Sequence, residues 1–314
     1  MALLLQYTLI FASVLLLVAL GGCFAERSGI VNIGLEGIMV IGALGGALAM
    51  KFIPVSVGGF VMIVAVIAAS VISGVIYSLF LAIPAINFNA DQTITGTAMN
   101  ILATAAATVA VKAMNTAASG GSDVSSEISY IQQKDFFIVR LGTFEFSWFM
   151  LVALIALVAA YIILYKTRFG LRMRACGEHP QAADSVGINV YKMRYAGTMI
   201  SGALGGLGGI VFITAGVSVW KFEYGVAGFG FLALAVMIFG AWHPIRIALA
   251  ALLFGFFRAL GNVYSGFEFM QALNLPSYVY NMLPYIVSLI VLALTSKKSR
   301  APKAEGIPYD KGQR

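Results

Sequence analysis

The chain is organised as long apolar runs separated by short polar breaks. Residues 55–83 and 148–165 contain very few polar residues, and apolar and polar positions do not alternate along them. A water-soluble fold needs polar residues to cover its surface, and these runs supply too few, so lipid has to cover them. Runs of about 18 or more apolar residues match a membrane-spanning helix, whereas a barrel strand has roughly 10 residues of alternating polarity. The pattern predicts an all-α, polytopic membrane protein.

Hydropathy predicts about nine transmembrane helices, with eight to ten compatible with the pattern. The expected spans cover residues 3–20, 30–50, 55–83, 93–112, 148–165, 195–214, 228–241, 246–264 and 280–296. The polar residues Glu26, Arg27, Asn32 and Glu36 interrupt the chain between the first two spans. A broken or re-entrant helix is therefore expected there as an alternative to a simple turn.

Charge is distributed unevenly and predicts the orientation in the membrane. Residues 166–194 and 297–314 each carry six basic and two acidic residues, within a total net charge of +7. Cytoplasmic segments carry the excess of Lys and Arg, so both segments are expected in the cytoplasm. The polar loop 113–147 and the amino terminus are then extracytoplasmic. We expect one transmembrane domain over residues 1–296, followed by a basic cytoplasmic tail.

Composition gives no support to an enzyme. The chain is 60% hydrophobic and 11% charged, whereas soluble domains carry roughly 25% charged residues. It contains no phosphate-binding loop, no His-Glu-x-x-His zinc motif and no Gly-x-Ser-x-Gly elbow, and its only histidines are His179 and His243. Cys23 and Cys176 lack metal-ligand spacing and are interpreted as small apolar fillers. We expect no catalytic residue, no metal site and no cofactor in this chain.

A glycine-rich pentapeptide occurs twice, about half a chain apart. Gly42–Gly46 and Gly202–Gly206 both read Gly-Ala-Leu-Gly-Gly, and both lie on helices expected to run from inside to outside. One explanation is a parallel duplication, with one helix followed by two four-helix units. The other is chance recurrence, because small residues let membrane helices approach closely.

The basic segment between the fifth and sixth spans is too long for a tight turn. It reads as a basic helix end, a break at Gly177–Pro180, a short helix over about Gln181–Ser185 and a stop at Gly187. A short rigid helix between two spans is a lever that a soluble partner can push. An ordinary solvated loop explains the same composition.

Several motifs resemble permeases of the branched-chain amino acid, ribose and nucleoside group of ABC transporters. Residues 177–188 resemble the loop that couples these permeases to their ATPase, with His179 in place of the usual Asn. Residues 26–37 resemble the amino-terminal signature of the nucleoside type. Further matching segments are residues 90–100, 230–235, 239–244 and 282–285.

The resemblance implies the channel-forming permease subunit of a type II-like ABC importer in a bacterial cytoplasmic membrane. Implied partners are an ABC ATPase subunit that binds ATP and Mg, a second, non-identical permease subunit, and an extracytoplasmic binding lipoprotein that delivers nucleosides. A sugar cargo and a homodimeric pore stay open. The residues expected to couple to the ATPase are Arg172, Arg174, Gly177, Glu178, His179, Pro180, Ala182, Ala183 and Gly187.

Polar residues within spans or at their ends are expected to line a substrate pathway or gate, because burying them in a bilayer is costly. These are Asn32, Glu36, Asp91, Gln92 and Asn100. Asn32 and Glu36 are one helical turn apart and are expected to share a face. Their carboxylates and amides suit ribose hydroxyls and base edges. Alternatively, Glu36 pairs with Arg27 or caps a broken helix.

Two other classes of function remain possible on sequence grounds. An ion-gradient-driven secondary transporter of a small polar solute would use the intramembrane acids as its ion site. A scaffolding subunit of a membrane enzyme would tolerate changes in the basic loop. On the outer loop, Trp220, Phe222 and Tyr224 are either membrane anchors or a stacking surface for a base or a docking protein.

Overall fold

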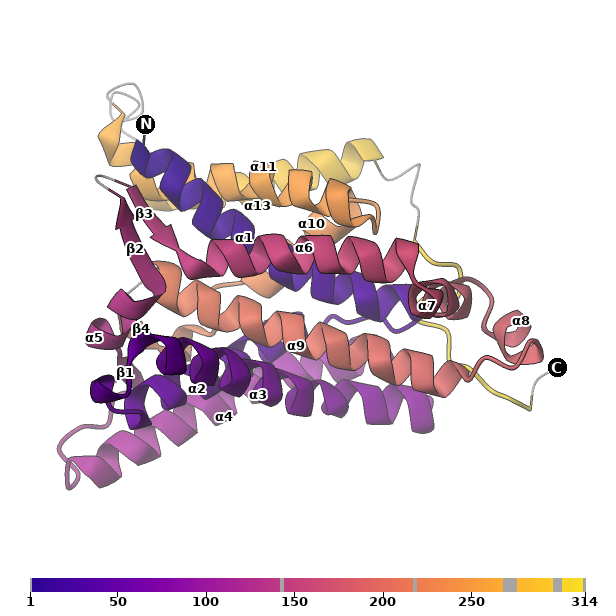
Figure 1. Cartoon of the computed structure of the whole chain (residues 1–314), viewed down its shortest axis with the longest axis horizontal. Coiled ribbons are helices and arrows are strands. Elements are labelled where there is room, and N and C mark those ends of the chain that lie inside the picture. The colour runs from indigo at the N-terminus through magenta and orange to yellow at the C-terminus, as the bar shows by residue number, and fades with distance from the viewer. Residues whose placement is uncertain (1, 142–143, 217–218, 268–275, 296–300, 313–314) are drawn as a thin grey trace.

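Long apolar helices run side by side along the long axis of the molecule (Figure 1). The computed structural model describes residues 2–141, 144–216, 219–267, 276–295 and 301–312. The long helices are α1 (Ala2–Arg27), α2 (Leu35–Phe52), α3 (Gly59–Asn87), α4 (Gln92–Ala118), α6 (Trp148–Lys166), α9 (Val190–Gly216), α11 (Pro244–Val263) and α13 (Ser277–Thr295). The shorter helices are α5 (Ile131–Lys134), α7 (Arg168–Glu178), α8 (Pro180–Ser185) and α10 (Phe229–Phe239).

Short strands and 3-10 turns complete the fold. The 3-10 turns are η1 (Val55–Val57), η2 (Asp135–Phe137), η3 (Phe222–Tyr224) and η4 (Tyr264–Gly266). The strands β1 (Glu127–Ser129) and β4 (Val219–Lys221) form one antiparallel pair, and β2 (Ile138–Leu141) and β3 (Phe144–Ser147) form another. The all-α, polytopic class predicted from the sequence is confirmed, since these strands are confined to one end of the helices (Figure 1).

Eight segments of the described chain are long and apolar enough to cross a membrane, and α13 contributes a shorter apolar stretch, Val279–Ile290. This agrees with the prediction of about nine spans. One of these eight segments, Phe222–Phe239, is not a single α-helix, because it consists of η3, a turn over residues 225–228 and α10. Helix α10 alone has 11 residues, or about 16 Å at 1.5 Å per residue. That is half the roughly 30 Å hydrocarbon thickness of a bilayer, so α10 is a half-length helix and not a full span.

The two ends of the molecule differ. The end that carries α7, α8 and the carboxy-terminal segment 301–312 is called the basic end below (Figure 1). The opposite end, called the hairpin end, carries the amino terminus and the four strands (Figure 1). The described part of the second basic segment, 301–312, therefore lies at the same end as the first (Figure 1), as the charge distribution predicts.

The core is built around α1 and α9. In their most apolar windows 67% and 72% of residues are buried, against 22% for α3 and for α6, which lie at the periphery. Glycines allow the close approach: a Cβ at Gly42 would overlap the backbone of Gly206, and one at Gly74 would overlap Gly202. The two glycine pentapeptides thus pack against each other, which is the use of small residues expected in membrane helices.

The segment between α1 and α2 corrects one expectation. Helix α1 continues to Arg27, residues 28–34 are irregular, and α2 begins only at Leu35. Asn32 therefore lies outside the helix that carries Glu36, and the predicted shared face is wrong. Irregular backbone at this depth is possible because neighbouring helices supply hydrogen-bond partners.

Two predicted loops are more ordered than expected. Helix α4 extends to Ala118 instead of ending near residue 112, and β1, α5 and the β2–β3 pair fold within the following segment. At the other end, α9 begins at Val190, so Arg194 belongs to this helix and is 1% exposed. The basic segment 166–194 is thus mostly helical.

Candidate functional site

Glu36, in the first turn of α2, receives the start of the half-length helix α10. One carboxylate oxygen accepts from the backbone N–H of Gly228 at 2.8 Å, and the other accepts from that of Gly230 at 2.7 Å. Glu36 is 8% exposed. A carboxylate is the favoured partner at a helix amino terminus, where backbone N–H groups lack partners and the helix dipole is positive. Of the alternatives drawn from the sequence, the structure supports Glu36 as the cap of a broken helix.

The contact lies deep in the helix bundle. The backbone N–H of Gly37 donates to Asn100 Oδ1 at 2.8 Å, and Asn100 lies eight residues after the start of α4, or about 12 Å along it. Helix α10 begins at the level of Glu36 and Asn100 and runs towards the basic end. Helix α10 therefore begins near the middle of the bundle, the arrangement of discontinuous helices that frame sites in many transporters.

The other predicted pathway residues fasten segment 28–34. Asn100 also donates to the carbonyl of Ile33 at 3.0 Å, and Gln92 Oε1 accepts from the N–H of Val31 at 2.7 Å. Asn32 donates to Ser201 Oγ at 2.8 Å, while its own Oδ1 is buried without a partner.

Asp91 differs from this group in its surroundings. Its side chain is exposed and caps α4 by accepting from the N–H of Ile94 at 2.8 Å. The structure therefore brings Asn100 and Glu36 to adjacent positions, but it places Asp91 apart from them.

A second group of polar residues lies at the level of Glu36, and reasoning from the sequence did not identify it. Arg258 of α11 donates to Asn281 Oδ1 of α13 at 3.2 Å, and its guanidinium lies 5.4 Å from the centre of the Phe229 ring. Tyr285 of α13 donates to the carbonyl of Ala227 at 3.1 Å. A signal was available, because Arg258 is the one charged residue in the stretch 247–267.

At the basic end, the end of α1 joins the turn between α10 and α11. Arg27 donates to the carbonyl of Trp242 at 3.1 and 3.3 Å, and the Trp242 indole N–H donates to Glu26. Ala241 and Trp242 have φ of 51° and 53°, a region that costs energy for residues other than glycine. The strained turn is thus held by α1.

The predicted coupling residues form the outermost part of this end (Figure 1). Helix α7 packs against α1, because a Cβ at Gly177 would overlap the carbonyl oxygen of Arg27. Glu178 also lies 3.8 Å from Arg27. The short helix predicted over 181–185 is confirmed as α8, with Pro180 in its first turn and Gly187 just beyond it at φ 81°.

The coupling residues divide into a buried and an exposed set. Pro180 and Ala183 are buried, as is Gly177 at the end of α7; Arg174 and Glu178 are half-buried; and Arg172, His179, Ala182 and Gly187 are exposed. Two neighbouring apolar side chains are strongly exposed as well, Val186 at 74% and Leu171 at 61%. This surface combines exposed apolar and basic groups outside the spans, as an interface with a soluble protein would.

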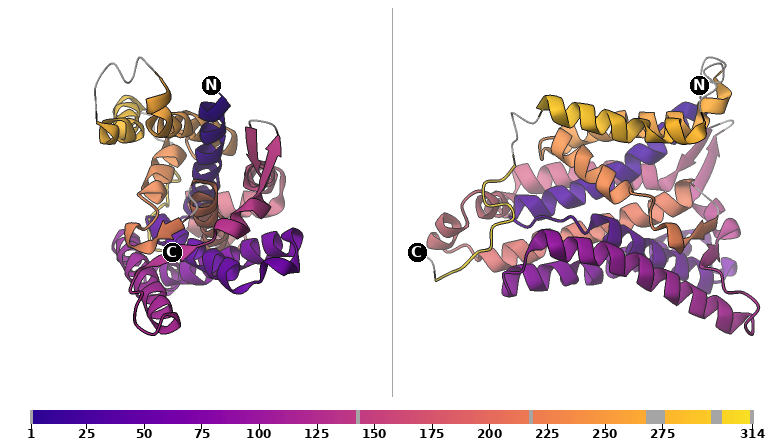
Figure 2. Two further views of the ribbon diagram at one scale, coloured as in Figure 1. Left: turned by 90° about the vertical axis from the view of Figure 1, so that its left-hand side faces the viewer. Right: turned by 180° about the vertical axis from the view of Figure 1, so that it is seen from behind.

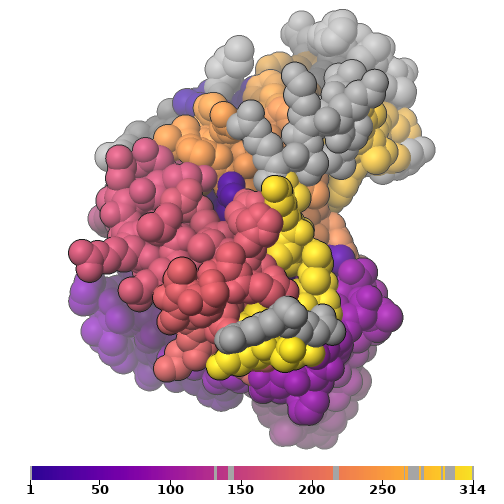
Figure 3. Space-filling model, turned by 90° about the vertical axis from the view of Figure 1, so that its right-hand side faces the viewer, coloured from indigo at the N-terminus to yellow at the C-terminus, as the bar shows by residue number. Residues whose placement is uncertain are grey.

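The carboxy-terminal segment 301–312 lies against the same end. The N–H of Ala304 donates to the carbonyl of Gly177 at 2.9 Å, and Arg194 donates to the carbonyl of Ile307 at 3.0 Å. Glu305 lies beside Glu26 and Arg27, and its burial raises the pKa of its carboxyl group. Figure 3 shows this segment, in yellow, crossing between α7 and α8 on one side and the purple helices on the other.

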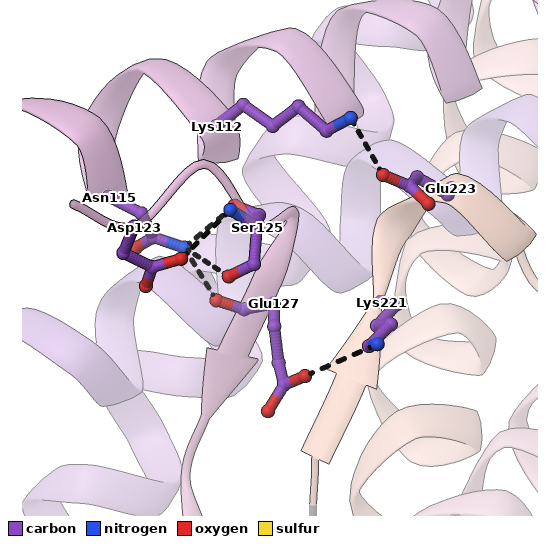
Figure 4. Close-up of polar contacts among 7 residues, drawn as sticks. All are labelled: Lys112, Asn115, Asp123, Ser125, Glu127, Lys221 and Glu223. Atoms are coloured by element: carbon purple, nitrogen blue, oxygen red, sulfur yellow. Dashed lines mark hydrogen bonds and ion pairs between the residues drawn. The ribbon is translucent and has the colours of Figure 1, made fainter. Parts of the chain in front are cut away.

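At the hairpin end, polar contacts tie α4 to the strands (Figure 4). Asn115 donates to the carbonyls of Ser125 and Glu127 at 3.0 and 2.8 Å. Lys112 pairs with Glu223 at 2.8 Å. Of the predicted aromatic surface, Trp220 is half-buried against Phe212, Phe222 is buried, and Tyr224 is 67% exposed.

Comparison with known proteins gives consistent matches. Residues 4–293 match the family described as the permease component of branched-chain amino acid transport systems. The chain is 43% identical to the guanosine ABC transporter permease protein NupQ of Bacillus subtilis, over 98% of this chain and 96% of the relative. It is 37% identical to the nucleoside ABC transporter permease protein NupC of Lactococcus lactis, over 97% and 96%. A second permease of that Lactococcus strain, NupB, is 30% identical over 50% of this chain and 44% of its own length.

Proposed function

Since this chain belongs to the permease-component family of branched-chain amino acid transport systems and is a permease subunit of an ABC importer, we propose that it carries nucleosides across a bacterial cytoplasmic membrane. The nucleoside cargo is inferred from near full-length similarity to two permeases, one named for guanosine and one for nucleosides. The sugar cargo considered from the sequence has less support, because the permease named for glucose is 31% identical over 82% of this chain.

We propose that the basic end faces the cytoplasm and that α7 and α8 dock into an ABC ATPase subunit, which binds ATP and Mg. The resemblance of residues 177–188 to the coupling loop of such permeases supports this, and the exposed Val186, Leu171 and Arg172 supply apolar and basic side chains for contact with a partner. The docking residues are those predicted from the sequence between Arg172 and Gly187.

The contacts at the basic end suggest how ATPase closure reaches the pathway. Movement of α8 passes to α7, then through Gly177 and Glu178 to the end of α1. Arg27 and Glu26 form hydrogen bonds with Trp242, which lies in the turn between α10 and α11. Helix α10 is then a rigid rod whose far end meets Glu36, so rotation at the basic end changes the packing in the middle of the bundle.

A complete importer needs further subunits. The two Lactococcus permeases, which differ from each other and both resemble this chain, support a pore built from this subunit and a second, non-identical one. An extracytoplasmic binding lipoprotein would deliver the nucleoside at the hairpin end.

Uptake of radiolabelled uridine, guanosine and adenosine, with ribose and leucine as controls, tests the proposal in cells with and without the gene. Nucleoside uptake should require the gene and persist when the proton gradient is collapsed with ATP maintained. Uptake lost with the gradient would support the ion-driven transporter instead.

Coupling is tested by the double variant Glu178→Arg, Gly187→Pro. Gly187 has φ 81° and its N–H donates to Asp184, and proline can satisfy neither condition. Uptake should be abolished at normal abundance in the membrane. Retained uptake would exclude α7 and α8 as the coupling element.

A further inference from the structure

The charged group of Arg258 lies in the bundle without a carboxylate partner. It belongs to α11, five residues before that helix ends at Val263, or about 7 Å from the helix end. In the part of the chain that the structure describes, no acidic group lies within ion-pair distance of it. Among the described residues it donates one hydrogen bond, to Asn281, and its buried Nε has no partner there.

Placing an arginine at this position in a span costs free energy, and a purely structural role does not explain that cost. A charged residue in a span costs a few kcal/mol on insertion scales, and such residues usually pair with one another or face a pathway. Arginine has five N–H donors and no acceptor, and the residues that the structure describes accept from one of them. The unused donors indicate a ligand with hydrogen-bond acceptors.

Aromatic rings surround the guanidinium. Phe229 lies 5.4 Å from it and Phe11 lies 5.9 Å from it. The Phe212 ring is 4.6 Å from that of Phe229, and Trp220 is 5.2 Å from Phe212. Phe229 and Phe11 are themselves buried, so they hold the guanidinium in place and do not offer a free ring face. The N–H donors of the half-buried guanidinium suit the acceptors at the edge of a planar heterocycle.

Part of each of the three polar side chains reaches the surface of the subunit. Arg258, Asn281 and Tyr285 are each half-buried. Seen along the helices in Figure 2, α10 lies between α13 and the α3–α4 pair. In Figure 3 the outline of the molecule is indented between the yellow α13 and the purple helices.

We propose that Arg258, Asn281 and Tyr285 recognise the base of the transported nucleoside beside the amino-terminal end of α10. This inference rests on the proposed nucleoside cargo. The planar fork of arginine matches the adjacent O6 and N7 acceptors of a 6-oxopurine, whereas adenine presents a donor at N6. The site therefore selects guanosine and inosine over adenosine.

The test is substrate preference in cells that carry variants in place of the chromosomal gene. Initial uptake rates of guanosine and adenosine are measured for Arg258→Gln and Arg258→Lys. Glutamine pairs with adenine N6 and N7, so Arg258→Gln should lower the guanosine-to-adenosine ratio about tenfold or more. Lysine keeps the charge but loses the fork, so Arg258→Lys should lower the ratio in the same direction.

The control is Phe256→Leu, two residues earlier on α11 at a position that is 40% exposed, and it should keep the wild-type ratio. An unchanged ratio in Arg258→Gln and Arg258→Lys, or an equal loss for both nucleosides at normal abundance, would overturn the assignment. If Arg258→Gln does not reach the membrane, the guanosine-to-adenosine ratio of Arg258→Lys alone tests the assignment. A wild-type chain that transports no nucleoside would instead refute the proposed function.

Discussion

Replacing Glu36 by glutamine tests whether the start of α10 depends on a carboxylate. Both carboxylate oxygens accept a backbone N–H, from Gly228 at 2.8 Å and from Gly230 at 2.7 Å. Glutamine keeps one acceptor oxygen, but its NH₂ group would face the other N–H, donor against donor. One of the two bonds is therefore lost, and the other becomes a bond between neutral groups.

The size of the effect follows from these two bonds. A hydrogen bond to a charged group contributes roughly 1.5–3 kcal/mol, and a neutral one about 1 kcal/mol. Losing one and weakening the other should destabilise this packing by about 2–5 kcal/mol. If the whole loss falls on the state that admits substrate, about 2 kcal/mol lowers uptake roughly thirtyfold.

Uptake and thermal melting of the detergent-purified protein should be measured together. The matched control is Glu223→Gln, because Glu223 belongs to an exposed ion pair with Lys112, and such pairs contribute little to stability. Glu36→Gln should lower both the uptake rate and the melting temperature, and Glu223→Gln should change neither. Equal behaviour of the two variants would refute the role of Glu36 as the cap of α10.

Three further substitutions test the basic end. Gly177→Ala places a Cβ on the carbonyl of Arg27, so uptake should fall at least tenfold at normal abundance. The control is Gly266→Ala, whose Cβ meets one described side-chain atom at 3.7 Å, and it should be neutral. A larger loss of uptake in Gly266→Ala than in Gly177→Ala would contradict the α1–α7 contact. Val186→Asp should reduce co-purification of the ATPase about tenfold, because it charges an exposed apolar contact, whereas Val124→Asp at the hairpin end should not. Burial raises the pKa of Glu305, so its ionised form opposes docking of segment 301–312, and docking strengthens as pH falls through that raised pKa. Glu305→Gln should therefore protect this segment from protease at neutral pH and remove the pH dependence; protection that weakens on acidification would show that the sign is wrong.

Local patterns predicted the features that depend on local chemistry. The uniformly apolar run 148–165 gave α6 within one residue, since lipid selects length and hydrophobicity directly. Pro180 and Gly187 bounded α8 because proline suits a first helical turn and glycine suits a positive φ just after the helix. The positive-inside pattern predicted one end for both basic segments, and segment 166–194 and residues 301–312 do lie at one end (Figure 1).

The roles of single polar residues could not be obtained in this way. Spacing put Asn32 and Glu36 on one helical face, but the chain is irregular until Leu35, and the side chains reach Ser201 and the start of α10. Gln92 and Asn100 suit a substrate equally well, yet each binds backbone of segment 28–34. An amide or carboxylate satisfies its hydrogen bonds with whatever group the fold brings near, and sequence spacing does not specify that group.

The sequence by itself determined that the chain lies in lipid, how many apolar segments it has, which ends carry positive charge and where the coupling helix begins and ends. These properties follow from hydrophobicity, length and turn chemistry, which act over a few residues; for α8 they set its bounds and leave its proposed coupling role to experiment. Only the tertiary structure decided that α10 is half-length, that its start meets Glu36, and that Arg258, Asn281 and Tyr285 gather beside it. Those contacts join residues as far as 194 positions apart, and they arise from how deep each helix lies and which face it turns inward, which are set by packing against all the other helices.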